Sequence, residues 1–193
     1  YKEADSIAHV VRQADLGLRE FFPDHRAVIL NVDNDSPDGT EDAFRHAGSR
    51  TPTLYLSTPP GVTGKGNNFW NLFVAARHLE AKSIVCVDAD LVSISPIWMR
   101  RLAEPVLNDL CDYITPIYAR NEYDGTITNN ICYPLIRGTL GTRIRQPIGG
   151  DFAFSGKLAR AFLAEKLWND KIANFGIDIW MTTIAIARGF NVC

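Results

Sequence analysis

The sequence has no excess of basic residues. Lys and Arg total 20 and Asp and Glu total 22, which leaves a formal net charge of −2 over 193 residues. Proteins that bind nucleic-acid backbones need clustered positive charge, whereas here the two signs are mixed along the chain. The charge balance therefore argues against nucleic acid as a partner.

Long hydrophobic runs and paired cysteines are also missing. No stretch of about 18 or more apolar residues occurs, so we expect no membrane segment, and the first residues do not resemble a secretory signal. The four cysteines include no C-x-x-C pair, and Cys86 lies in an apolar run, as a buried free thiol would. These absences predict a soluble, cytoplasmic protein in a reducing compartment. The four histidines share no ligand spacing, which argues against a zinc site.

The composition is that of a globular domain. Hydrophobic residues make up 46% and charged residues 22% of the chain, which is enough apolar material for a core. The length exceeds the roughly 100–150 residues of a typical domain, but it lies within the range of one α/β domain. We therefore expect one domain.

Helix-like and strand-like patterns alternate along the chain. The predicted helices cover residues 4–20, 40–47, 67–80, 96–110, 156–165 and 177–188, and the predicted strands cover 27–32, 53–57, 83–87 and 113–118. This alternation predicts an α/β, Rossmann-like fold, with a mixed, mainly parallel sheet and helices on both faces. Residues 121–130 and 144–154 fit neither pattern, so we expect loops there.

The strongest local signal is an Asp-x-Asp motif at the end of a predicted strand. The apolar run 83–87 leads directly into Asp88 and Asp90, and the carboxyl ends of strands in open α/β sheets face the ligand crevice. Both carboxylates can reach one hard cation, Mg²⁺ or Mn²⁺, which can also bind the oxygens of a diphosphate. The alternative is a strand-end turn with solvated aspartates, because the motif alone is common.

A lysine between two glycines precedes the helix predicted from residue 67. Gly64 and Gly66 permit close approach of the backbone to a ligand, and Lys65 adds positive charge near a helix N-terminus, where anions are favoured. The segment is not a Walker A loop, since no Ser or Thr follows the lysine. A solvated surface turn is the alternative.

Three further segments carry polar groups suited to a nucleotide sugar. Asp33 and Asn34 follow the first predicted strand, where they could hydrogen-bond a base or ribose, although a capped loop explains them equally well. Residues 149–151 and Asp178 place glycines and carboxylates where a sugar could bind. The alternative for Asp178 is a first-turn residue that the helix dipole stabilises.

Five segments, taken in order, resemble one family. They are Asn31–Ser36, Gly64–Gly66, Val87–Leu91, Gln146–Asp151 and Phe175–Asp178. Over nearly its whole length the chain resembles the retaining GT-A glycosyltransferases that include glucosyl-3-phosphoglycerate synthase and, more distantly, mannosylglycerate synthase. The resemblance implies an enzyme that uses Mg²⁺ or Mn²⁺ to move a hexosyl group from a UDP- or GDP-sugar to a small hydroxyl acceptor.

The same resemblance implies roles for individual residues. Asp88 and Asp90 match the metal-binding pair, with Asp90 favoured as the direct ligand. The donor-binding positions correspond to Asp33, Asn34, Lys65, Asp88, Gly149 and Gly150. The catalytic positions near the donor sugar correspond to Lys65, Asp151 and Asp178. The acceptor-binding stretch corresponds to Thr126 and Thr128.

The chain departs from this family at three places. Thr126 stands where the phosphoglycerate-using enzymes have an arginine, and a hydroxyl cannot replace a bidentate guanidinium, so phosphoglycerate does not carry over as the acceptor. The family's opening strand would precede Tyr1, and its metal-site histidine would follow Cys193. We therefore expect a domain truncated at both ends, with a nucleotide-sugar half over 1–118 and an acceptor half over 119–193.

Two other functions fit the same pattern. A sugar nucleotidyltransferase shares the sheet architecture and the use of a metal and a lysine, but it would release pyrophosphate instead of a nucleoside diphosphate. A non-catalytic nucleotide-sugar-binding domain would bind the donor without turnover. The sequence leaves the oligomeric state open, a homodimer included.

Overall fold

The computed structural model describes residues 1–119, 121 and 124–193. Its helices are α1 (Ile7–Phe21), α2 (Thr40–Arg45), α3 (Lys65–His78), α4 (Ile97–Leu107), α5 (Tyr133–Leu140), α6 (Gly156–Ala164) and α7 (Ile177–Ala187), with π-helical turns η1 (Thr128–Cys132) and η2 (Ile172–Gly176). Its strands are β1 (Ile29–Asp33), β2 (Thr53–Ser57), β3 (Ser83–Cys86), β4 (Tyr113–Ile114) and β5 (Phe152–Ser155). The predicted α/β class is confirmed.

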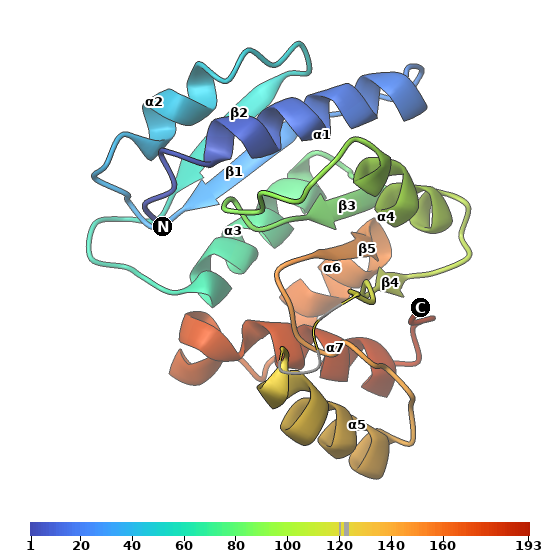
Figure 1. Ribbon diagram of the computed structural model, residues 1–193. Helices are drawn as coiled ribbons and strands as arrows, with labels where there is room; N and C mark the ends of the chain where they lie inside the picture. The colour runs from blue at the N-terminus through green and yellow to red at the C-terminus, as the bar shows by residue number, and fades with distance from the viewer. Residues whose placement is uncertain (120, 122–123) are drawn as a thin grey trace.

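The strands form two hydrogen-bonded groups, one parallel and one antiparallel (Figure 1). β1 and β2 are parallel, with Ile29 opposite Thr53. β5 lies between β3 and β4 and is antiparallel to both. The mixed architecture is confirmed, although its antiparallel part is larger than predicted. Because β5 comes from the predicted acceptor half and its partners from the nucleotide-sugar half, the two halves share one sheet.

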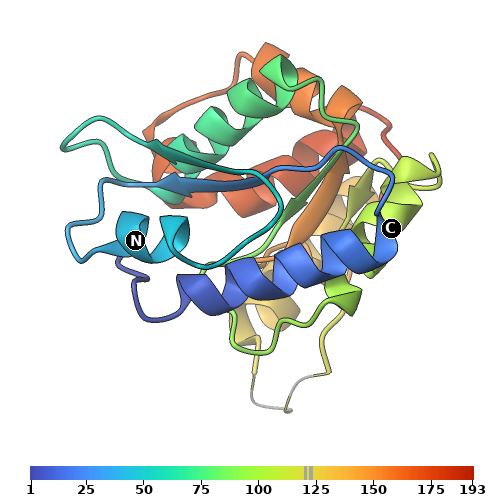
Figure 2. The same ribbon diagram turned by 90° about the horizontal axis from the view of Figure 1, so that it is seen from above.

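Helices cover both faces of the strands. Figure 2 shows α1 on one face of the sheet and α3 on the opposite face. The apolar residues of α1 recur at helical spacing and bury Ile7, Val10, Val11 and Ala14. Part of this face packs with Met99 and Ala103 of α4 in one apolar cluster.

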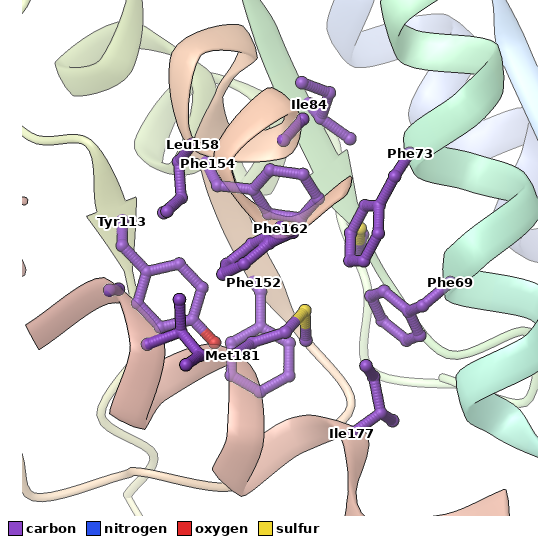
Figure 3. Packing of buried hydrophobic residues seen from close by; sticks show 14 of the residues in the cluster. Phe69, Phe73, Ile84, Tyr113, Phe152, Phe154, Leu158, Phe162, Ile177 and Met181 are labelled. Atoms are coloured by element: carbon purple, nitrogen blue, oxygen red, sulfur yellow. The ribbon is translucent and has the colours of Figure 1, made fainter. Parts of the chain in front are cut away.

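The largest core is aromatic and lies between β3 to β5 and the helices α3, α6 and α7 (Figure 3). Phe73, Phe152, Phe154 and Phe162 are fully buried in it. The rings of Phe73 and Phe162 have centroids 5.0 Å apart, which joins α3 to α6. This packing fixes the starts of α3 and α7 relative to the end of β3, the three points from which the candidate site is built.

The structure differs from the sequence prediction mainly after residue 113. β4 ends at Ile114, two residues before Pro116, although a strand over 113–118 was predicted. η1 begins inside the loop predicted over 121–130, and α5 follows it at Tyr133. Three of the four residues of β5 lie in the other predicted loop, 144–154. The strand was missed because all four residues are buried, which leaves no alternating pattern to detect.

Two of the four cysteines form a disulfide. Cys111 and Cys193, separated by 82 positions, form a disulfide, whereas Cys86 is free and buried, as expected. Disulfides are rare in reducing compartments, so this bond counts against the compartment predicted from cysteine spacing. Within the described ranges, no helix is long and apolar enough to cross a membrane.

The contribution of the aromatic core to the free energy of unfolding can be tested by substitution. Phe162→Ala removes a fully buried ring that contacts three other aromatic rings, so we expect a loss of about 3–5 kcal/mol in the free energy of unfolding. Urea denaturation measures it. Phe175→Ala, at a side chain that is 90% exposed, is the matched control and should change stability by less than about 0.5 kcal/mol. Equal losses in the two variants would refute this description of the core.

Candidate functional site

A half-buried lysine joins two carboxylates from distant segments. The Nζ atom of Lys65, the first residue of α3, lies 3.4 Å from Oδ2 of Asp178 and 3.5 Å from Oδ1 of Asp88. It also donates to the carbonyl oxygen of Gly149 at 3.3 Å. Asp178 belongs to the first turn of α7, and Asp88 follows β3. The structure therefore brings together four predicted site residues that are up to 113 positions apart.

Two glycines allow α3 to approach η2 closely enough for this contact. A Cβ atom at Gly66 would overlap the carbonyl oxygen of Ile172, and one at Gly64 would overlap the backbone of Ala173. Gly64 also has a φ of +111°, which favours glycine. In the structure these glycines approach another segment of the backbone, and the approach to a ligand stays a prediction. Its effect is to hold the start of α3 beside the start of α7.

Burial and charge together set the protonation of this cluster. Burial raises the pKa of Asp178 to about 6, although the Lys65 ammonium acts in the opposite direction. Burial raises the pKa of Asp151 too, helped by the charge of Asp88 and opposed by a hydrogen bond from the Tyr118 hydroxyl. Burial disfavours the charge of Lys65, but Asp178 and Asp88 outweigh it and raise its pKa. Lys65 is therefore a fixed cation at neutral pH.

The Asp88 carboxylate occupies space that is open because residue 150 is glycine. A Cβ atom at Gly150 would overlap the Asp88 carboxylate. The Asp88 side chain is 47% exposed even though it pairs with Lys65, and Asp90 is exposed. Within the described residues, no group of three or more His, Cys, Asp or Glu side chains has metal-binding geometry. The protein thus offers two accessible carboxylates at the end of β3.

Two buried oxygen atoms at the site have no hydrogen-bond partner in the described part of the chain. They are Oδ1 of Asp151 and Oδ1 of Asp178. The other oxygen of each carboxylate is occupied, by the Tyr118 hydroxyl and by Lys65 respectively. Buried polar atoms are rarely left unpaired in native proteins, so these two atoms are suited to accept hydrogen bonds from the hydroxyl groups of a ligand.

Asp33 and Asn34 serve the local structure at the end of β1. Asp33 accepts hydrogen bonds from the Ser36 amide at 2.6 Å and from its hydroxyl at 2.7 Å, the pattern of a capped loop. Asn34 donates to Oδ1 of Asn68 in α3 at 2.9 Å. Asn34 therefore ties the end of β1 to the helix that carries Lys65.

The two predicted acceptor residues lie in different surroundings. Thr128, the first residue of η1, is 5% exposed, which leaves its hydroxyl little surface for a ligand. Thr126 is exposed two residues earlier. Sequence reasoning also missed Tyr118, which contacts Asp151. Its place at the carboxyl end of the strand predicted over 113–118 was the signal that could have identified it.

Comparison with known proteins shows similarity to solved structures. No family model and no curated protein matches the chain. Mycobacterium tuberculosis glucosyl-3-phosphoglycerate synthase matches in complex with Mn²⁺, UDP-glucose and phosphoglyceric acid, at 20% identity and a TM-score of 0.66 over 96% of this chain and 62% of that chain. A second structure of the same synthase matches at 21% identity and a TM-score of 0.62, over the same shares of the two chains.

A mycobacterial protein of unstated activity matches at 26% identity, with a TM-score of 0.61 over 80% of this chain and 50% of that chain. These matches confirm the predicted GT-A fold. The chain spans between 50% and 62% of the length of these three solved structures.

Gly150 offers a test of the local geometry. Gly150→Ala places a methyl group against the Asp88 carboxylate, so we expect a loss of about 1–3 kcal/mol in the free energy of unfolding. Gly138→Ala is the matched control, because an added Cβ there meets no atom within 4 Å and should be neutral or stabilising. A Gly150→Ala protein as stable as the wild type would show that the two groups are not in contact.

The ionisation of Asp178 is a second test. We expect Lys65→Met to raise the pKa of Asp178 above its value of about 6, because the substitution removes a cation 3.4 Å from the carboxylate. Carbon-13 NMR titration of the side-chain carboxyl, with a chelator present, measures it. Lys157→Met, at a surface lysine, is the control and should leave this pKa unchanged. An Asp178 pKa near the ordinary 3.8 in every variant would contradict the description.

Proposed function

We propose that this chain carries the donor site of a hexosyltransferase that uses a nucleoside diphosphate sugar, linked to UDP or GDP, and a small hydroxyl acceptor. The observation that carries the proposal is the Lys65 ammonium held between Asp88 and Asp178 at the carboxyl end of β3. Ligands of open α/β sheets bind at this edge. The shared fold with a synthase solved with Mn²⁺ and UDP-glucose supports the same choice.

Asp88 and Asp90 fit a divalent cation. Both carboxylates are accessible, both follow the same strand, and oxygen ligands of this kind suit Mg²⁺ and Mn²⁺. Two carboxylates are sufficient protein ligands where the phosphates of the substrate and water complete the coordination. A bound ion would neutralise negative charge on the diphosphate of the donor.

The remaining residues would each contact a different part of the donor. Lys65 would contact the diphosphate, where its fixed charge stabilises the departing group. Gly149 and Gly150 would line the hexose, with the unpaired oxygens of Asp151 and Asp178 accepting hydrogen bonds from its hydroxyl groups. Asp33 and Asn34 would lie beside the base and ribose. Thr126 would face the acceptor, whereas Thr128 is buried and would act only by supporting this stretch.

In the proposed reaction, an oxygen of the acceptor forms a bond to the anomeric carbon of the hexose. The bond between that carbon and the β-phosphate oxygen breaks, and its electron pair leaves with the nucleoside diphosphate. The acceptor oxygen bonds to the carbon on the face from which the phosphate departs, so the anomeric configuration is retained, and the acceptor proton passes to the departing phosphate oxygen on that face. Lys65 acts by stabilising the negative charge that develops on this oxygen.

The donor site can be tested by calorimetry with UDP-glucose and GDP-mannose, each with Mn²⁺ or with a chelator. We expect binding of one nucleotide sugar that requires the metal, and Asp90→Ala should weaken it at least tenfold, about 1.4 kcal/mol, because a cation ligand is lost. Asp90→Ala suits this purpose because Asp88 also pairs with Lys65. Asp24→Ala, at an exposed aspartate remote in sequence, is the matched control.

Two outcomes would contradict the proposal. Binding that is equally strong in chelator and in the Asp90→Ala protein would remove the metal from the donor site. Release of pyrophosphate, instead of nucleoside diphosphate, during turnover would identify a nucleotidyltransferase.

A further inference from the structure

A buried hydroxyl group on α7 binds the segment that carries the two site glycines. Thr182 is fully buried, and its Oγ1 atom donates a hydrogen bond to the carbonyl oxygen of Pro147 at 2.8 Å. It lies four residues after Asp178, about one turn further along the same helix. Residues at this spacing share one face of a helix. That face of α7 therefore contributes Asp178 to the site and Thr182 to the segment around Pro147.

Tyr113 of β4 fixes the direction of this hydrogen bond. Its hydroxyl oxygen lies 3.3 Å from Oγ1 of Thr182, and Figure 3 shows its ring pointing from β4 toward α7. A threonine hydroxyl has one proton and a carbonyl oxygen only accepts, so Thr182 donates to Pro147 and Tyr113 donates to Thr182. Burial raises the pKa of Tyr113 well above its ordinary value, so this phenol keeps its proton. Two oriented hydrogen bonds thus run from the sheet through α7 to Pro147.

Three successive carbonyl groups of this segment each accept a hydrogen bond from a side chain. In the order of the carbonyls at positions 147, 148 and 149, the donors are Thr182, Gln146 and Lys65. Thr182 and Lys65 come from other elements, so they hold the segment from outside. Gly150, the next residue, lies so close to Asp88 that an added Cβ atom would overlap the carboxylate. A displacement at position 147 would therefore reach the two glycines that we assign to the hexose.

We propose that Thr182 is a positioning residue of the donor site, which sets the place of Gly149 and Gly150 and through them the fit of the donor hexose. The inference rests on the proposed glycosyltransferase function. Thr182 has no exposed surface, so it acts through the segment that it holds and not by contact with a ligand. Its hydroxyl controls the affinity for the hexose and leaves the contacts of the metal and the nucleotide unchanged.

The hydroxyl can be removed with little change of shape. Thr182→Val keeps the β-branched side chain and replaces the hydroxyl by a methyl group, whereas Thr182→Ser keeps the hydroxyl. Thr183→Val makes the same change at the next residue of α7, which is partly exposed, and is the matched control. Calorimetry with Mn²⁺ measures the binding of UDP-glucose and of UDP, which lacks the hexose, to all four proteins. GDP-mannose and GDP replace this pair if the wild type selects the guanosine donor.

We expect Thr182→Val to bind the nucleotide sugar about 3- to 10-fold more weakly, the loss that one neutral hydrogen bond typically represents, and to bind the free nucleotide as the wild type does. Thr182→Ser should recover the affinity, and Thr183→Val should match the wild type. Amide NMR spectra without ligand should show shifted signals of Gly149 and Gly150 in Thr182→Val and wild-type signals in Thr182→Ser. The same spectra report whether each variant is folded.

A second variant tests the hydrogen-bond chain from its other end. Tyr113→Phe removes the proton donor to Thr182 and leaves the bond from Thr182 to Pro147 in place. We expect it to weaken binding of the nucleotide sugar by a smaller factor than Thr182→Val and to leave binding of the free nucleotide unchanged. If Thr182→Val does not fold, this variant decides the question, and an affinity for the nucleotide sugar equal to that of the wild type would reject the inference.

The inference is overturned if folded Thr182→Val binds the nucleotide sugar as tightly as the wild type, or if it loses affinity for the free nucleotide by the same factor, as a merely structural role would require. The ligand-free spectra keep this failure separate from that of the proposed function. Donor binding with unchanged signals at Gly149 and Gly150 rejects the role of Thr182 alone. Shifted signals that Thr182→Ser restores, in a protein that binds no nucleotide sugar, uphold the positioning of the segment and reject the glycosyltransferase function.

Discussion

The ion pairs of Lys65 with Asp178 and Asp88 are the contact on which the site depends. A charged group in a partly buried position is costly unless oppositely charged groups compensate it. Here the compensation comes from α7 and from the end of β3, so the charge of the lysine is compensated only while three separate segments stay in place. The glycines of α3 let it meet η2, and the aromatic core holds α3 and α7 against β5. The aromatic core thereby holds the Lys65 ammonium in its position.

This cation lies within a polar network that extends in two directions. Lys65 contacts Gly149 and Asp178 in the region we assign to the donor sugar, and the Tyr118 hydroxyl donates a hydrogen bond to Asp151. Asp151 and Asp178 each keep one unpaired buried oxygen. Fully paired networks make a fold rigid, whereas partly paired ones leave capacity for a ligand.

The sequence predicted the elements that local patterns determine. Strand β2 matches its predicted range, and the positions of α1, α3, α6 and α7 follow from helical spacing of apolar residues. The sequence also predicted that Asp88 follows a strand, and β3 ends two residues before it. The missed features are non-local: β5 is a strand only because β3 and β4 flank it, and Cys111 pairs with Cys193 across 82 positions. The packing role of Gly64 and Gly66 was invisible for the same reason, since their neighbours lie more than a hundred residues later.

The central claim is that the groups around Lys65 bind the diphosphate of a sugar donor. Paramagnetic broadening by Mn²⁺ in amide NMR spectra tests it most directly, because the effect reports distance from the ion to each residue. In the presence of UDP-glucose, or of the GDP-sugar if calorimetry selects it, we expect the amide signals of Lys65, Asp88, Gly150 and Asp178 to broaden strongly and to recover when a chelator is added. Signals that stay sharp at these four residues while the donor binds would contradict the account.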